Sequence, residues 1–187
     1  MAEDQNTIAR TLHDVGLGAW FGGSLMGALS LNRAAAEVKD PSERGRVASA
    51  GWARWTPVNL AAIGAYVVGG FQLMRANKAR MAGQRGVGGM TLAKGIISGM
   101  ALAYTGYARA LGQRIMSQGD VPVQDGTTPL PETPEEVQRA QRQLKILQYA
   151  IPAHVAALIA ISAKMGEQQR PTRVAKGIAG RFRRNAA

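Results

Sequence analysis

Four stretches of this chain contain no charged residue, and strongly basic segments separate them. They cover residues 15–31, 55–74, 95–108 and 146–163, so they are 17, 20, 14 and 18 residues long. A helix needs about 20 largely apolar residues, at about 1.5 Å of rise each, to cross a bilayer. The third run reaches that length only if it includes 88–93 and if Lys94 or Arg109 extends toward the interface. The pattern predicts four membrane-spanning helices.

The first run, Val15–Leu31, contains five glycines, although glycine is the poorest helix former after proline. In lipid no hydrophobic force drives helices together, so association depends on close backbone approach, which small residues four apart permit. Each of the four runs carries small residues at this spacing. We therefore expect seven glycines to be helix-packing residues: Gly18, Gly22, Gly23, Gly27, Gly69, Gly95 and Gly99.

These observations predict an all-α fold, a four-helix transmembrane bundle with a long loop before the last helix. The expected organisation is an N-terminal segment (1–14), a membrane domain (15–165) with an extramembrane loop (115–132), and a basic tail (166–187). The alternative is a soluble bundle with unusually apolar buried helices. Small residues at helical spacing would leave such a bundle a thin core, which counts against it.

Lys and Arg counts predict the orientation of the chain. With the amino terminus inside, thirteen basic residues lie on the inner side and ten on the outer side. Cytoplasmic segments carry the excess of Lys and Arg, so both termini are expected in the cytoplasm of a multi-pass plasma-membrane protein. The first residues lack the pattern of a cleavable signal peptide, so the first helix is expected to stay.

The formal net charge of +11 would suit nucleic acid or an anionic membrane surface. Only three Phe are present and no stripe alternates aromatic with basic residues, so nucleic acid is not an expected partner. Anionic lipids are expected to contact the basic tail, or else the tail is solvated and only fixes topology. The expected lipid contacts are Arg173, Lys176, Arg181, Arg183 and Arg184.

Groups that carry chemistry are few. The chain has no cysteine, and its only histidines are His13 and His154. These two are expected to differ in depth by about 12 Å, too much to hold one haem between them. No carboxylate lies inside a run, which disfavours an ion pump. We expect no catalytic residue, metal or cofactor. His154, near the middle of the fourth run, is the one possible functional polar residue, because ionisable groups inside a membrane are costly.

The segment before the last helix carries a local signal. Thr133 as N-cap, Pro134 at the first helical position and Glu136 three residues after the cap predict a capping box. The helix that begins there is expected to continue unbroken into the fourth run. Its first turns would then stand outside the membrane.

Several stretches resemble a group of small actinobacterial membrane proteins of unassigned function. They are residues 16–28, GWARWTPVN (51–59), ALGQRIM (110–116) and MGEQQRP (165–171). The resemblance covers most of the chain and implies a four-helix integral membrane fold. It supplies no catalytic residues.

The expected function is that of a non-enzymatic structural or accessory subunit of a larger membrane assembly. More small-residue stripes are present than one bundle must bury, so other membrane subunits or a second copy are the expected partners beside the lipid. The alternatives are a small transporter or lipid-handling component, and a soluble helical scaffold attached to a membrane.

Overall fold

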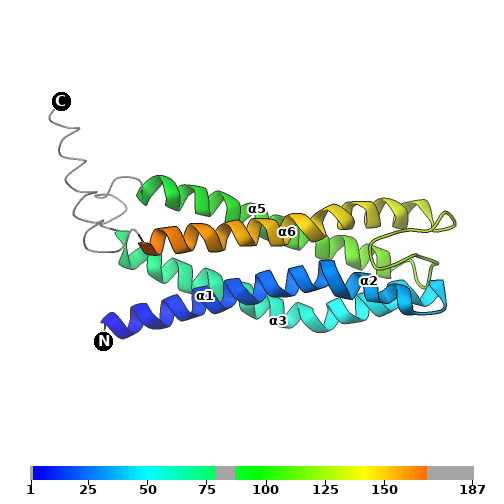
Figure 1. Cartoon of the computed structure of the whole chain (residues 1–187), viewed down its shortest axis with the longest axis horizontal. Helices are drawn as coiled ribbons and strands as arrows, with labels where there is room; N and C mark the ends of the chain where they lie inside the picture. The colour runs from blue at the N-terminus through cyan, green and yellow to red at the C-terminus, as the bar shows by residue number, and fades with distance from the viewer. Residues whose placement is uncertain (1, 79–86, 168–187) are drawn as a thin grey trace, which may run out of the picture.

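The computed structural model describes residues 2–78 and 87–167, and nearly all of its regular structure is helical (Figure 1). The long helices are α1 (Ala2–Met26), α3 (Pro41–Ala76), α5 (Val87–Met116) and α6 (Glu135–Glu167). Short turns connect α1 to α3: η1 (Gly27–Leu31), α2 (Asn32–Ala34) and η2 (Ala35–Glu37). One isolated β-bridge, between Val123 and Pro129, is the only strand pairing in the described ranges. The prediction of an all-α chain is confirmed.

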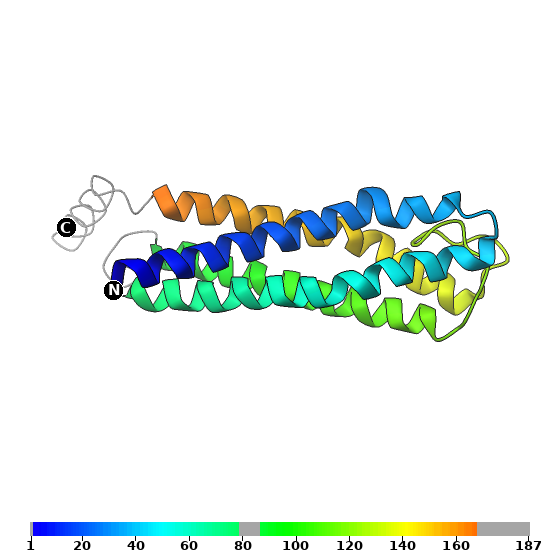
Figure 2. The ribbon, with the colours of Figure 1, turned by 90° about the horizontal axis from the view of Figure 1, so that it is seen from below.

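The four long helices lie side by side along the length of the molecule in two perpendicular views (Figures 1 and 2). α1 packs against α3, and α5 packs against α6. α1 also contacts α6 and joins the two pairs, whereas α3 and α5 barely meet. The start of α1, the end of α3, the start of α5 and the end of α6 lie at one end, which we call the terminal end.

Among the described residues, three of the four long helices are long and apolar enough to cross a membrane. They are α3, α5 and α6, with mean hydropathies of 1.3, 1.2 and 1.7. The sequence predicted four. α1 does not join them because its α-helical part includes charged residues such as Arg10 and Asp14 and ends at Met26, inside the uncharged run. The last residues of that run form the π-helical turn η1.

The boundaries differ from the expected organisation at the start of the chain and in the loop before α6. Residues 2–14 are part of α1 and do not form a separate segment. α5 ends at Met116, so the loop before α6 covers 117–134. The basic tail beyond Glu167 lies outside the described residues, and so do its five expected lipid contacts.

The loop 117–134 folds back against the α1–α3 connection. The Val123 N–H donates to the Pro41 carbonyl oxygen at 3.1 Å, and the Gly126 N–H donates to that of Asn32 at 3.0 Å. Val123 is fully buried in the hydrophobic core. Gln141 of α6 donates to the Asp125 carbonyl oxygen at 3.1 Å, so the loop is attached to both helix pairs.

Thr133 closes this loop. Its hydroxyl donates to the Pro122 carbonyl oxygen at 2.5 Å and accepts from the Leu130 N–H at 2.9 Å. The Glu136 side chain accepts from Gln118 at 3.3 Å. The expected capping box between Thr133 and Glu136 is therefore replaced by contacts to the loop.

The start of α3 follows a standard pattern. Asp40 is the N-cap and accepts from the Ser42 N–H at 2.9 Å and the Ser42 hydroxyl at 2.7 Å, with Pro41 in the first turn. The two hydrogen bonds from Ser42 hold the pKa of Asp40 below its usual value, because they favour the carboxylate.

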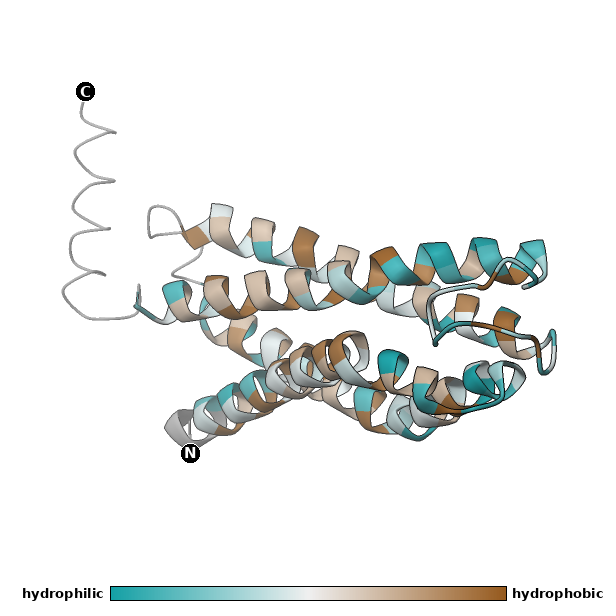
Figure 3. Cartoon of the chain, turned by 45° about the vertical axis from the view of Figure 1, so that its right-hand side comes forward, coloured by the Kyte–Doolittle hydropathy of each residue, from teal (hydrophilic) through white to brown (hydrophobic). Residues whose placement is uncertain are grey.

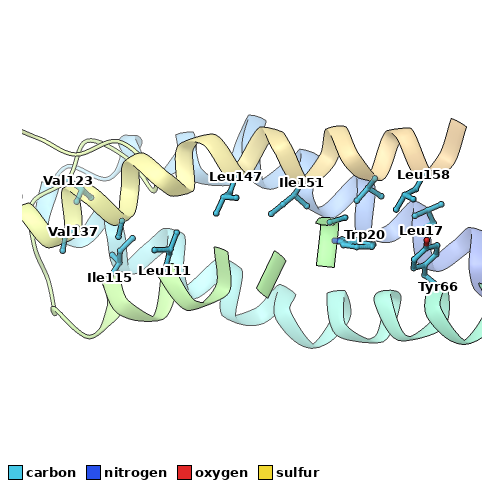
Figure 4. Packing of buried hydrophobic residues seen from close by; sticks show 13 residues of the cluster. Leu17, Trp20, Tyr66, Leu111, Ile115, Val123, Val137, Leu147, Ile151 and Leu158 are labelled. Carbon is cyan, nitrogen blue, oxygen red and sulfur yellow. The ribbon is translucent and has the colours of Figure 1, made fainter. Parts of the chain in front are cut away.

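The hydrophobic core lies along the contact between α1, α5 and α6 (Figure 4). Trp20 of α1 is fully buried there, with Leu17 beside it. α6 contributes residues from Val137 to Leu158, and α5 contributes Leu111 and Ile115. Hydrophilic residues gather at the end away from the termini, on the first turns of α6 and the neighbouring loop (Figure 3). Many large apolar side chains of α3 and α5 point outward, including Val68, Phe71, Leu92 and Ile96.

Candidate functional site: a polar cleft between α3 and α5

A cleft of about 460 Å³ opens where α3 and α5 diverge, in the half of the molecule nearer the terminal end. Its size falls in the range of small-molecule sites in proteins. α3 supplies apolar walls through Val67, Phe71 and Met74, and α5 supplies Leu102. Ionisable groups of α1 and α5 line it as well: Arg10, His13, Asp14 and Lys94.

Three of those groups form a chain of hydrogen bonds. The His13 ring is 2% exposed and lies between Asp14 and Lys94. Its Nδ1 is 2.6 Å from Asp14 Oδ1, and its Nε2 is 2.6 Å from Lys94 Nζ. A lysine ammonium has only donors, so Nε2 must accept, and Nδ1–H then donates to the carboxylate. A neutral imidazole thus holds the Lys94 ammonium inside the cleft.

Tyr66 of α3 lies beside this chain. Its ring centroid is 5.0 Å from that of His13, and Lys94 Nζ lies 5.8 Å from the ring centroid. Its hydroxyl is 2.5 Å from Ser98 Oγ. Because the Ser98 hydroxyl donates to the Lys94 carbonyl oxygen at 2.8 Å, it accepts from Tyr66. Tyr66 and Ser98 thus form a hydrogen bond between side chains of α3 and α5.

Two glycines bring α1 close enough to α3 for this arrangement. A Cβ at Gly69 would lie 2.4 Å from the Ala9 carbonyl oxygen and 2.6 Å from the His13 nitrogen. A Cβ at Gly16 would lie 2.3 Å from the Ala62 carbonyl oxygen and 2.6 Å from the Tyr66 nitrogen. Backbone atoms cannot move away as a side chain can, so only glycine fits. The close approach places His13 against Tyr66.

Of the seven glycines expected to pack helices, three lie at helix contacts. Gly69 packs against the α1 backbone. Gly23 and Gly27 lie against tryptophan rings of α3, since a Cβ at either would be 2.2 Å from Trp55 or Trp52 respectively. Gly23 and Gly27 meet side-chain rings, whereas Gly16 packs directly against the backbone of α3. The four-residue spacing did not select Gly16.

The other four glycines make no such contact within the described chain, and a role for them in helix packing stays a prediction. A Cβ at Gly18, Gly22, Gly95 or Gly99 would meet no atom within 4 Å. Gly18 and Gly22 lie on the exposed face of α1. Gly95 and Gly99 line the cleft, and because α3 does not close onto α5 there, their missing side chains widen the opening.

His154, the histidine that the sequence singled out, does not join the cleft. Its Nδ1 lies 2.8 Å from the Ala150 carbonyl oxygen of its own helix, and Tyr104 packs edge-on at 5.2 Å between centroids. Sequence reasoning missed the His13–Lys94 pair instead. One signal could have found it: Lys94 lies directly before an uncharged run and His13 two residues before another, and both positions were expected on the inner side.

Chemically, the cleft suits an anion better than a cation or a metal. The cleft is lined by two cationic side chains, Lys94 and Arg10, and by one carboxylate, that of Asp14. The Asp14 side chain is 60% exposed to solvent. Within the described ranges, no three His, Asp or Glu side chains lie close enough to hold a metal ion. The apolar walls would accept the hydrocarbon part of a ligand whose charged group reaches Lys94.

Comparison with known proteins adds no match: no protein family, no curated protein and no solved structure is similar to this chain. The resemblance to small actinobacterial membrane proteins stays a prediction. The geometry of the cleft and the apolar helices around it are therefore the features that bear on function.

Proposed function

We propose that this protein is a non-enzymatic, integral membrane protein that binds an anionic lipid in the cleft between α3 and α5. The observation that carries the proposal is the combination of apolar walls with a lysine held inside the cleft. A charged group among apolar residues of a membrane protein is costly, and such groups commonly mark a binding or transport site. An anionic headgroup would pair with Lys94 while an acyl chain covers Phe71 and Leu102.

The exposed surface of the helices supports a membrane location. Val68, Phe71, Leu92, Ile96 and Ile146 are each at least half exposed. In water such side chains would leave large apolar patches, which soluble monomers rarely carry. Lipid tails would cover them, and a lipid could then enter the cleft sideways between α3 and α5.

The proposal includes α1 as a fourth span and places both termini in the cytoplasm of a plasma-membrane protein. A reporter that works only in the cytoplasm should be active at residue 187. It should be inactive when inserted after Gly119, in the loop between α5 and α6. If the reporter is active after Gly119 and inactive at residue 187, the orientation is the opposite of the one proposed.

Lipid binding is tested with purified protein in mild detergent, by adding phosphatidylglycerol or phosphatidylcholine and counting retained lipids by native mass spectrometry. We expect phosphatidylglycerol to be retained in preference to phosphatidylcholine. Gly99→Leu should weaken retention at least about tenfold, because the new side chain fills the cleft without meeting protein atoms. Lys94→Gln should remove the preference for the anionic lipid.

Gly106→Leu is the matched control. Gly106 lies on the same helix, a Cβ there also meets nothing within 4 Å, and the residue does not line the cleft. It should bind phosphatidylglycerol as the unchanged protein does. Equal retention of both lipids, unaffected by Gly99→Leu and Lys94→Gln, would overturn the proposal.

A second candidate function is that of an accessory subunit in a larger membrane assembly. The observation in its favour is the face of α1 with Gly18 and Gly22, four residues apart, exposed and unpacked in this chain. Small residues at this spacing let a neighbouring membrane helix approach closely. A partner helix bound there would be compatible with an occupied lipid cleft, because Gly18 and Gly22 do not line it.

A further inference from the structure

A second cavity, of about 130 Å³, lies between α1, α3, α5 and α6 toward the end away from the termini. All three tryptophans of the chain line it: Trp20 of α1, and Trp52 and Trp55 of α3. An apolar cavity of about 150 Å³ is large enough to hold benzene. The tryptophan cavity is therefore of a size that suits one six-membered ring.

Two of the three indoles have hydrogen-bond partners. The Trp52 Nε1–H donates to Asn32 Oδ1 at 2.8 Å, and the Trp20 Nε1–H donates to Thr105 Oγ1 at 3.3 Å. Trp55 Nε1 is buried and has no partner among the described residues. The same holds for Oδ1 of Asn59, which also lines the cavity. Buried polar atoms in native proteins are rarely left without a partner, so this pair requires an explanation.

Trp55 and Asn59 are four residues apart on α3 and so lie on one face of the helix, a turn apart. The first offers a donor and the second an acceptor. The Trp55 ring is held against α1, because a Cβ at Gly23 would be 2.4 Å from its Nε1. A hydroxyl group can accept from an indole N–H and at the same time donate to an amide oxygen, so it has the hydrogen-bonding capacity that these two atoms lack.

We propose that the tryptophan cavity binds a small apolar molecule with one hydroxyl group, which accepts from Trp55 Nε1–H and donates to Asn59 Oδ1. The ring or hydrocarbon of the ligand would contact Trp20 and Ile151, which also line the cavity. This inference is independent of the lipid site, because the two cavities share no lining residue.

The test measures binding of cyclohexanol, cyclohexanone and cyclohexane by the intrinsic tryptophan fluorescence of the purified protein in detergent. Every tryptophan lines this cavity and none lines the lipid cleft, so the emission responds to a ligand bound in the tryptophan cavity. We expect saturable binding of cyclohexanol, about tenfold tighter than that of cyclohexane, the combined effect of its two hydrogen bonds to buried groups. Cyclohexanone accepts but cannot donate, and it should bind less tightly than the alcohol.

Asn59→Leu and Trp55→Phe each remove one of the two hydrogen bonds, so each should weaken cyclohexanol binding about threefold, and Trp55→Phe keeps an aromatic ring. Gln72→Leu is the matched control, since Gln72 is an exposed amide on the same helix that lines neither cavity. It should leave the affinity unchanged. The proposal is overturned if cyclohexanol gives no saturable response, which would leave a bound water as the partner of these atoms. It is also overturned if the three ligands bind the unchanged protein equally.

Discussion

Replacing Gly16 with leucine is expected to separate α1 from α3 and to lower the free energy of unfolding by about 3 kcal/mol, at the upper end of overpacking effects. The new side chain would meet the Ala62 carbonyl oxygen and the Tyr66 nitrogen, which are backbone atoms and cannot change rotamer. Reversible unfolding in mixed micelles with increasing SDS, followed by tryptophan fluorescence, measures the loss. The Tyr66–His13 contact should be lost with it.

Gly18→Leu is the matched control for this prediction. Gly18 lies two residues further along α1, on its exposed face, and a Cβ there meets nothing within 4 Å. Leucine is the better helix former, so this variant should be as stable as the unchanged protein or slightly more stable. If both variants unfold at the same SDS fraction, the close approach of α1 to α3 does not stabilise the fold.

The glycines show how far the sequence could predict packing. Four-residue spacing correctly marked α1 as a helix that packs tightly, but two interleaved pairs, Gly18–Gly22 and Gly23–Gly27, fit the rule equally well. Only Gly23 and Gly27 face α3, where the rings of Trp55 and Trp52 pack against them. The spacing rule also passes over Gly16. The position of a partner helix decides which face is buried, and a single helical segment carries no information about it.

The number of long helices could be predicted because uncharged runs bounded by basic residues are a local property. Their lengths could not, since the helices have 25, 36, 30 and 33 residues and extend well beyond the runs. The cleft could not, since it results from α3 and α5 failing to meet along their length. The His13–Lys94 hydrogen bond joins residues 81 positions apart. Burial of a charged group among apolar helices is visible only once the helices are placed, so reasoning from one run favoured His154 at its centre.

The second large effect is expected at His13. In His13→Leu the Lys94 amine stays in the cleft but loses the ring nitrogen that accepts its hydrogen bond. Leaving a buried polar group without its partner costs about 1–3 kcal/mol, and we expect the free energy of unfolding to fall by that amount. His154→Leu is the control. Among the described contacts, the one hydrogen bond of the His154 ring is to the Ala150 carbonyl oxygen of its own helix. Removing the ring should therefore lower the free energy of unfolding by less than about 1 kcal/mol.

A double-mutant cycle with Lys94→Met separates the pair from its surroundings. Methionine keeps most of the length of the lysine side chain without its charge, so no buried unpaired group remains when both residues are changed. The Asp14 carboxylate also loses His13, but it is 60% exposed to solvent. Replacing both partners of a buried polar pair by apolar groups can be nearly neutral. The double variant should therefore be more stable than His13→Leu alone, although it carries one more substitution. Strictly additive losses in the two single variants would mean that His13 does not hold Lys94, and the cation in the cleft would need another explanation.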